Sequence, residues 1–326
     1  MVDFRVSVGL TAGVASALVG GAWQVATRHS TITTIAPADL AILRYAIPAM
    51  VLAPVWLRVG LLPRGVPLRW LLGMVLGAGL PFGLVAMTGT KFAPSAHMGV
   101  FMAGASPLFA TGLAWMLWKD RPDRSRSWGL AFLVAGMAAL GAGSFRGIDT
   151  DAWRGDLLFL LAAVLWAGFT LSFRRSGLSG WQGAAVVNAW SAILLVPWLL
   201  WRGETGLVDA PVPDVLWQAL MQGVIAGLLG LWIFSAVVSR LGAPRASAFG
   251  GLVPVFSAGG GWWWLAEPIT GVDLLAITSA VVGGRWQAVP GRAAAGRNQP
   301  RGKSYSRSIT GSMEPCATRR RTAASI

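Results

Sequence analysis

The residues that could carry chemistry in this sequence are a few polar side chains inside long apolar runs. The most informative is Arg44, which lies about six residues, roughly 9 Å at 1.5 Å per residue, from the end of its run. A charge at that depth in lipid needs a partner, water or a path to the membrane surface. Two interpretations stay open. Arg44 is either a structural residue that snorkels or caps carbonyl groups, or a cation that faces a cavity and an anionic substrate group.

Other polar or aromatic residues at or near membrane depth extend this candidate substrate site. Asn188 suits a hydrogen bond between helices as well as a ligand contact, and His97 suits an interface residue as well as a proton carrier. Trp166 and Trp190 lie in the middle of apolar runs, where they either line a cavity or pack against neighbours. The full set of candidate substrate-binding residues is Arg44, Tyr45, Trp166, Asn188, Trp190, Gln24 and His97.

Residue sets typical of enzymes and cofactor sites are missing from the sequence. No Asp or Glu lies at the centre of an apolar run, so a carboxylate proton relay at the midplane is not supported. There is no GxGxxG after a strand, no Walker lysine, no zinc spacing and no Ser/His/acid set. Cys316 is the sole cysteine, which excludes an intrachain disulfide. We therefore predict a protein that is not an enzyme, with no cofactor and no metal.

Composition indicates which elements must hold these residues. The chain is 55% hydrophobic and 12% charged, with a mean hydropathy of +0.60. Its apolar runs of roughly 20 residues have the length of an α-helix that crosses the hydrocarbon core. The first run is longer than the apolar part of a signal peptide, which is the minor alternative for it. We predict an all-α integral membrane protein with ten transmembrane helices near residues 6–27, 38–58, 69–90, 95–118, 127–144, 155–173, 181–201, 215–238 and 245–265 and, for the tenth, a short or defective helix from 271.

A repeated pattern divides the chain into two halves. Pro107, Asp120 and Gly136 recur with equal spacing as Pro254, Glu267 and Gly283. Each copy holds five predicted helices, an odd number, so the two copies must lie in opposite orientations in the membrane. We predict a first repeat over residues 1–148 and an inverted second repeat over 149–284. A substrate site is then expected near the midplane between them.

Basic residues predict the orientation of these helices. The loops on the side of the N-terminus contain 12 of them: Arg5, Arg58, Arg64, Arg69, Lys119, Arg121, Arg124, Arg126, Arg174, Arg175, Arg240 and Arg245. The loops on the other side contain five: Arg28, Lys91, Arg146, Arg154 and Arg202. The positive-inside rule therefore predicts that the N-terminus and the C-terminus are cytoplasmic.

In these positions the sequence resembles the drug/metabolite transporter superfamily, in its ten-helix EamA-like form. The resemblance covers roughly residues 5–284 and is carried by Arg44, Pro107, Asp120-Arg121-Pro122, Ala135-Gly136, Pro254, Glu267-Pro268 and Gly283. The first repeat departs from the pattern because Asp120 stands where a Glu is usual.

The resemblance implies a secondary-type carrier of the inner membrane, usually an exporter of metabolites, amino acids or toxic compounds, that works by alternating access. The alternative is a non-transporting membrane sensor or assembly scaffold. A polar cavity between the two halves would distinguish them, because a carrier needs such a cavity and a scaffold can fill it with side chains.

The end of the sequence differs in composition from everything before it. From Arg285 to residue 326 it consists mainly of Arg, Gly, Ala, Ser and Pro without periodicity, with only Glu314 as an acid. We predict a basic, disordered tail near anionic lipid. Interleaved aromatic residues are nearly absent, so no nucleic-acid partner is expected. A shifted reading frame near the end of the coding DNA would produce the same abrupt change, and a natural basic tail is the alternative.

Overall fold

The computed structural model of the chain describes residues 4–146, 151–203, 205–241, 246 and 249–288, and these residues form helices and no strands. The predicted tail from residue 289 onward lies outside the described residues. In chain order the helical segments are α1 (Phe4–Thr33), α2 (Pro37–Val51), α3 (Ala53–Val59), α4 (Leu68–Ala78), α5 (Leu80–Gly89), α6 (Ser95–Met98), η1 (Gly99–Gly104), α7 (Ser106–Trp118), α8 (Arg124–Arg146), α9 (Ala152–Ser176), α10 (Gly180–Arg202), α11 (Val212–Gln218), η2 (Ala219–Gly230), α12 (Leu231–Leu241), η3 (Gly250–Leu252), α14 (Val253–Leu265) and α15 (Gly271–Ala288).

The described helices confirm an all-α, multi-pass membrane protein. Seven are long and apolar enough to cross a membrane: Gly9–Thr33, Leu68–Gly89, Ser95–Trp118, Arg124–Ser144, Ala152–Ser176, Gly180–Arg202 and Val212–Leu241. The bent pair α2 and α3 would make an eighth. The predicted total of ten stays a prediction, because α14 and α15 are not among the seven. Helix α15 has 18 residues, about 27 Å at 1.5 Å per residue, and Arg285 lies in its last turn.

The span predicted over residues 38–58 is bent by 69° at Leu52, between α2 and α3. The cause is Pro54 in the first turn of α3. Its ring has no N–H and clashes with the carbonyl of the residue four positions earlier. The bend frees the carbonyl of Ala49, which accepts a hydrogen bond from the Trp56 indole N–H at 2.8 Å. The polar group exposed by the bend is thus satisfied locally.

A second interruption lies between α4 and α5, where Gly79 is extended with a ψ of −156°. Two neighbouring helices bond the backbone groups at this break. The Tyr45 hydroxyl donates to the Gly79 carbonyl at 2.6 Å, and the Leu80 N–H donates to the Ser191 hydroxyl at 3.0 Å. The break is therefore held by side chains of α2 and α10.

Irregular winding occurs just before the two prolines that the repeat pattern pairs. The wide π-helical segment η1 ends shortly before Pro107, which lies in the first turn of α7. The tight 3-10 segment η3 ends just before Pro254, in the first turn of α14. A longer π-helical segment, η2, separates α11 from α12.

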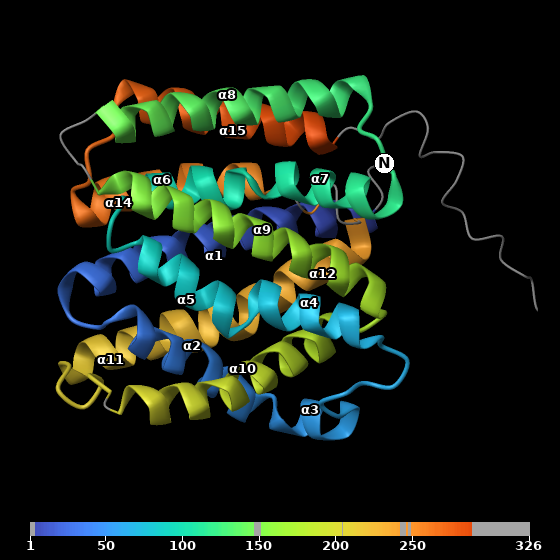
Figure 1. Ribbon diagram of the computed structural model, residues 1–326, viewed down its shortest axis with the longest axis vertical. Helices are drawn as coiled ribbons and strands as arrows, with labels where there is room; N and C mark the ends of the chain where they lie inside the picture. Colours follow the sequence, from blue (N-terminus) through green and yellow to red (C-terminus); the bar gives the residue numbers. More distant parts are fainter. Residues whose placement is uncertain (1–3, 147–150, 204, 242–245, 247–248, 289–326) are drawn as a thin grey trace, which may run out of the picture. The chain divides into compact units, whose positions relative to one another are not determined.

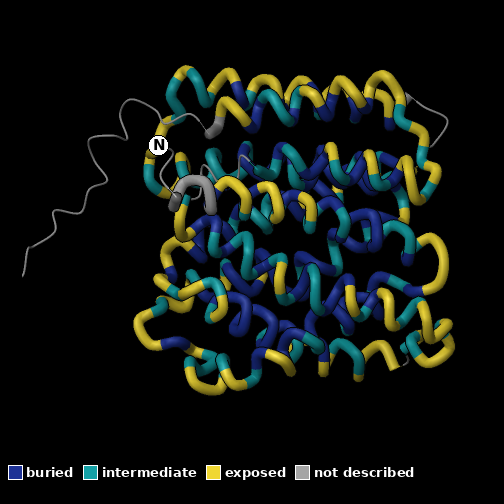
Figure 2. Tube along the Cα trace, turned by 180° about the vertical axis from the view of Figure 1, so that it is seen from behind, coloured by how far each residue is buried: buried dark blue, intermediate teal, exposed yellow. Residues whose placement is uncertain are grey.

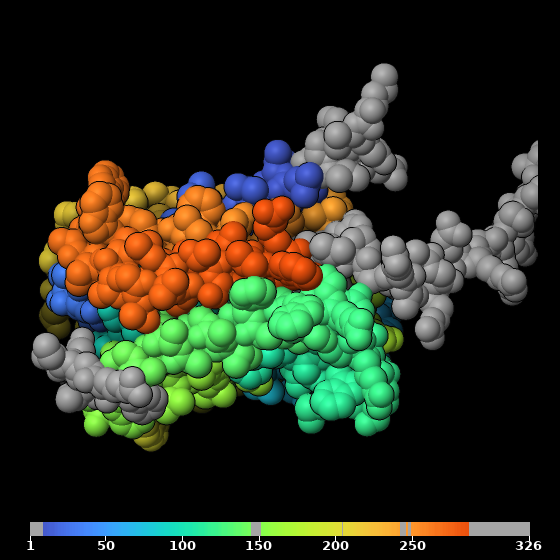
Figure 3. Space-filling view, turned by 90° about the horizontal axis from the view of Figure 1, so that it is seen from above, coloured from blue at the N-terminus to red at the C-terminus, as the bar shows by residue number. Residues whose placement is uncertain are grey.

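The long helices run side by side, with buried residues in the middle and exposed residues along the rim (Figures 1 and 2). Helices α8 and α15 pack closely against each other on one face (Figure 3). Their contact depends on glycine. A Cβ at Gly136 would lie 2.7 Å from the Ser279 side chain, and one at Gly283 would lie 2.7 Å from the Gly129 carbonyl. These two glycines are equivalent in the predicted repeat.

The connections between helices alternate between two ends of the bundle. One end, called here the α1–α2 end, carries the turns after α1, α5, α10 and α14. The opposite end carries the turns after α3, α7 and α9. The ion pair between Arg28 and Glu267 and the one between Arg202 and Asp39 connect segments at the α1–α2 end.

Candidate functional site

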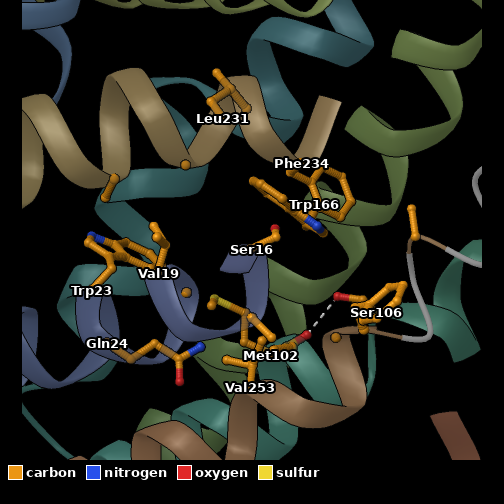
Figure 4. Close-up of a pocket in the computed structure, with 18 of the residues that line it drawn as sticks. Ser16, Val19, Trp23, Gln24, Met102, Ser106, Trp166, Leu231, Phe234 and Val253 are labelled. Carbon is orange, nitrogen blue, oxygen red and sulfur yellow. Dashed lines mark hydrogen bonds between the residues drawn. The ribbon is translucent and has the colours of Figure 1, made fainter. Parts of the chain in front are cut away.

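A cavity lies in the middle of the helix bundle (Figure 4). It contains about 810 Å³ of empty space, including its open mouth. Helices of both predicted halves line it, and most of the lining is apolar. Along α1 the lining runs from Ser16 to Gln24, and it continues to Phe249 and Gly250, which lie after the last residue of α12 at the opposite end. The cavity therefore extends from the middle of the bundle toward the end opposite the α1–α2 end.

Aromatic rings from four helices form a connected group around the cavity. The Phe82 ring of α5 lies 6.1 Å from the Trp23 ring of α1 and 5.2 Å from the Trp166 ring of α9. The Trp166 ring also lies 5.0 Å from the Phe234 ring of α12. Trp166 and Phe234 lie beside each other, away from Trp23 (Figure 4). A cavity lined in this way favours an apolar or aromatic molecule.

Arg44 brings a positive charge to this cavity. Its side chain lies over the Trp23 ring at 4.6 Å, and the residue is 5% exposed. Its Nε and Nη1 atoms are buried and have no hydrogen-bond partner. A buried guanidinium normally uses its donors fully, because unsatisfied buried donors are costly. Two donor groups of a residue that lines the cavity therefore lack a partner within the described protein.

Gln24, which also lines the cavity, carries an acceptor. The residue is 1% exposed, and its side-chain oxygen Oε1 is buried without a hydrogen-bond partner. Its neighbours, in contrast, are bonded to the second half of the chain. The Trp23 indole N–H donates to Gln222 Oε1 at 2.7 Å, and the Gln222 amide donates to Thr27 at 2.9 Å. The residues that line the cavity thus include one unsatisfied acceptor as well as unsatisfied cationic donors.

Comparison with known proteins relates part of the chain to a transporter family. The EamA-like transporter family matches residues 153–284. A probable amino-acid metabolite efflux pump of Salmonella typhimurium is 27% identical over 221 residues, which is 64% of this chain and 73% of that protein. The family match covers the second half of the chain, and both comparisons support a place in the drug/metabolite transporter superfamily. They point to a membrane transporter rather than an enzyme.

Two further proteins are similar to this transporter. Protein LicB of Haemophilus influenzae is 27% identical over 135 residues, which is 40% of this chain and 45% of that protein. A protein of known crystal structure matches 90% of this chain and 99% of its own, with a TM-score of 0.58 and 18% sequence identity. That likeness concerns the fold alone.

The structure of the transporter brings three of the seven predicted site residues to the cavity: Arg44, Gln24 and Trp166. The other four are not among the lining residues. Tyr45 lies beside Arg44, whose guanidinium is 5.7 Å from its ring, and its hydroxyl bonds the break at Gly79. The Asn188 amide donates to the Ala184 carbonyl at 2.8 Å. The Trp190 indole donates to the Leu61 carbonyl at 2.8 Å. His97 contacts Asp156 at the α1–α2 end.

The motif residues of the EamA-like pattern lie outside the cavity. Pro107 and Pro254 are buried in the first turns of α7 and α14. Asp120 is exposed after α7. Glu267 connects three segments, because it accepts hydrogen bonds from Arg28 of α1 and from the backbone and hydroxyl of Ser95 of α6.

Sequence reasoning missed most of the apolar lining of the transporter. The missed residues include Trp23, Phe82, Met102, Ser106, Phe234 and Phe249. Only their position inside apolar runs could have indicated them, and many lipid-facing residues share that position. Among the described residues, no group of three or more His, Cys, Asp or Glu side chains is placed to hold a metal ion.

Proposed function

We propose that this transporter exports small amphipathic metabolites, in particular α-amino acids with large apolar side chains. The observation that carries the proposal is the set of unsatisfied groups on two residues that line the cavity: Nε and Nη1 of Arg44, and Oε1 of Gln24. The arginine donors fit a carboxylate, and the amide oxygen fits an ammonium group. The rings of Trp23, Phe82 and Trp166 fit an apolar side chain. The similarity to an amino-acid metabolite efflux pump supports the same class.

We further propose that transport occurs by alternating access between two inverted five-helix repeats. The helix contacts support this arrangement. When each helix is replaced by its predicted equivalent in the other repeat, the resulting helix pairs are also in contact. Helix α1 packs against α14 and α12, and its predicted equivalent α9 packs against α7 and α4. The pairs α2 with α10 and α8 with α15 each consist of two equivalent helices in contact. Such exchange symmetry is typical of carriers built from inverted repeats.

The location and direction of transport follow from the same proposal. The protein is placed in the inner membrane with its N-terminus in the cytoplasm, as the 12 basic residues in the loops on that side suggest. The cavity then extends toward the cytoplasm, and the polar contacts of the α1–α2 end close the outer side. This is the conformation in which an exporter collects its substrate.

Transport of matched compounds tests the assignment of the two polar groups. L-Phenylalanine, phenethylamine and 3-phenylpropanoate share one ring, but the second lacks the carboxylate and the third lacks the ammonium group. Hydrogen bonds to charged groups contribute about 1.5–3 kcal/mol, or about 10- to 100-fold in affinity. Arg44→Gln should therefore weaken L-phenylalanine binding by that factor and change phenethylamine binding little. Gln24→Leu should reduce the preference for L-phenylalanine over 3-phenylpropanoate.

The measurements are competition and efflux in proteoliposomes, with Arg174→Gln as the control. Arg174 is exposed at the end of α9, outside the cavity lining. Equal losses for all three compounds in Arg44→Gln would contradict the carboxylate assignment. A fall in protein abundance that matches the fall in transport would show instead that Arg44 is structural.

A further inference from the structure

His97 lies between two carboxylates at the α1–α2 end, in a cluster separate from the substrate cavity. Its Nδ1 atom is 2.8 Å from Asp156 Oδ1 at the start of α9. Its Nε2 atom is 3.9 Å from Asp273 Oδ1 in the first turn of α15. The three side chains are only 12%, 7% and 8% exposed. The imidazole therefore joins the fourth predicted span to α9 and to α15.

Each carboxylate is fixed through its second oxygen. Asp156 Oδ2 accepts a hydrogen bond from the Ser144 hydroxyl at 2.6 Å. Asp273 Oδ2 accepts bonds from the Thr270 backbone N–H at 2.7 Å and from the Thr270 hydroxyl at 2.6 Å. The first oxygen of each carboxylate is thus the one directed at His97. The cluster is organised around the ring.

The charged groups around His97 already have partners, so the His97 ring is the group whose protonation can change. Among the described residues, no Lys or Arg forms an ion pair with Asp156 or Asp273. Of the elements packed against α6, η1 and α14 carry no charged residue, and α9 adds only Arg154 near this end, which pairs with Asp151. Helix α1 adds Arg28, paired with Glu267, and His29, stacked on Trp264. Among the side chains that the structure describes, the two acids therefore share His97 as their basic partner.

The protonation of His97 changes the sign of one of its two contacts. An ionised carboxylate only accepts hydrogen bonds, so the short contact with Asp156 requires a hydrogen on Nδ1. In the neutral ring Nε2 then presents a lone pair toward the negative charge of Asp273, which is repulsive. A second proton on Nε2 converts this contact into an attraction. Histidine is the side chain that ordinarily gains or loses this proton between pH 5 and pH 8.

We infer that His97, Asp156 and Asp273 form a proton-binding site that couples substrate export to a proton gradient. A proton that binds Nε2 from the outer side draws α15 toward α6 and closes the α1–α2 end. Its loss from Nε2 to the other side restores the repulsion and favours opening. One proton enters from one face of the membrane and leaves at the other in each cycle, so the driving force is the gradient itself.

A short chain of contacts connects this site to the substrate cavity. Ser95, two residues before His97 on α6, donates to Glu267, and Glu267 pairs with Arg28 at 3.0 Å. Arg28 lies four residues after Gln24 on α1, so the two share a face of the helix one turn apart. A movement of α6 therefore acts on the helix that carries part of the substrate site.

The first test measures the proton without using transport. The chain has two histidines, so the His29→Gln variant leaves His97 as its single imidazole. With ¹⁵N-labelled histidine in nanodiscs, the His97 signals should change from the neutral to the doubly protonated form as the pH is lowered from 8 to 5. Asp273→Asn should change the pH dependence of those signals. A ring that stays in one state across the range, or a transition that Asp273→Asn leaves in place, overturns the inference.

The second test rests on the proposed export function and separates the two ideas. Proteoliposomes are loaded with radiolabelled L-phenylalanine, and both exchange and gradient-driven movement are followed. With one proton per substrate, each pH unit should support about a tenfold concentration ratio in the wild type, since one unit equals about 1.36 kcal/mol. His97→Gln should keep exchange but lose accumulation, and His29→Gln should behave as the wild type.

The outcomes are distinguishable. Exchange without any response to the pH gradient in the wild type overturns the proton site and leaves the transporter proposal standing. No movement of L-phenylalanine or related amino acids in any variant contradicts the export proposal, and the labelled-histidine measurement then decides the proton site. If His97→Gln does not fold, Asp273→Asn replaces it, with a weakened response to the gradient as the expected result.

Discussion

Glu267 is the residue whose replacement should open the closed end of the transporter. One of its carboxylate oxygens accepts from Arg28 at 3.0 Å, and the other accepts from the Ser95 backbone and hydroxyl. The Arg28 and Glu267 side chains are only 17% and 13% exposed, so solvent screens the pair little. Glu267→Gln removes the charge and replaces one accepting oxygen by a donor group, which then faces another donor.

The size of the effect follows from the bonds that are lost. Hydrogen bonds to a charged group contribute about 1.5–3 kcal/mol, which corresponds to about 10- to 100-fold in the ratio of open to closed molecules. Asp151→Asn is the control, because Asp151 pairs with Arg154 where both side chains are about half exposed. Such exposed pairs contribute about 0–1 kcal/mol at most.

Cysteine accessibility measures the opening. Cys316 is the sole cysteine, so Cys316→Ser gives a background without thiols. Val19→Cys then places one thiol in the cavity wall. An impermeant maleimide added outside the cell should label Val19→Cys faster when Glu267→Gln is also present. Equal labelling in the wild type, Glu267→Gln and Asp151→Asn backgrounds, with equal amounts of folded protein, would refute the reasoning.

Three other predictions use different features of the chain. Gly77→Ala should destabilise the protein by about 1–3 kcal/mol, because a Cβ there would lie 2.3 Å from a backbone carbonyl of α9, whereas Gly168→Ala has open space and should change the melting temperature little. Reporter fusions after Arg126 and after Glu204 should report opposite sides of the membrane, and equal signals would contradict the proposed topology. Removal of residues 291–326 should leave insertion and transport intact if the basic tail is not part of the fold, and resequencing the DNA across Gly283 to Pro290 tests the reading frame directly.

The sequence predicted the helices better than it predicted their faces. Apolar runs located the spans within a few residues, because insertion depends on summed hydropathy. The bend at Leu52 was missed because the residues around Pro54 stay apolar through it. Trp23 was missed for a more general reason. Lipid and protein interior are both apolar, so no amphipathic pattern marks the face of a membrane helix that lines a cavity.

Among the polar residues too, some could be recognised from the sequence and others could not. Arg44 stood out because a charge in an apolar run is unusual, and the structure places it at the cavity. The contact between His97 and Asp156 joins two residues that are 59 positions apart in the sequence. A pairing of that kind leaves no local signature, so only the arrangement of helices in space could show it. Whether Arg44 and His97 bind substrate and proton stays a prediction.

The different winding before Pro107 and Pro254 has a consequence for how the molecule changes shape. The π-helical η1 and the 3-10 segment η3 are in contact. A Cβ at Gly99 would lie 2.7 Å from the backbone of Pro254, two residues after η3 ends. In the proposed repeat these are two copies of one segment, one wound wide and the other wound tight. In alternating access between two inverted repeats, each repeat takes the conformation that the other had before. The two segments must then also exchange their types of helix, π and 3-10. The outward-open form should then have a tightened helix at Gly99–Gly104 and a loosened one at Gly250–Leu252. The conformational change of the transporter would then consist of a coupled rewinding of two helices in contact, and not of a rigid-body rotation of the two halves.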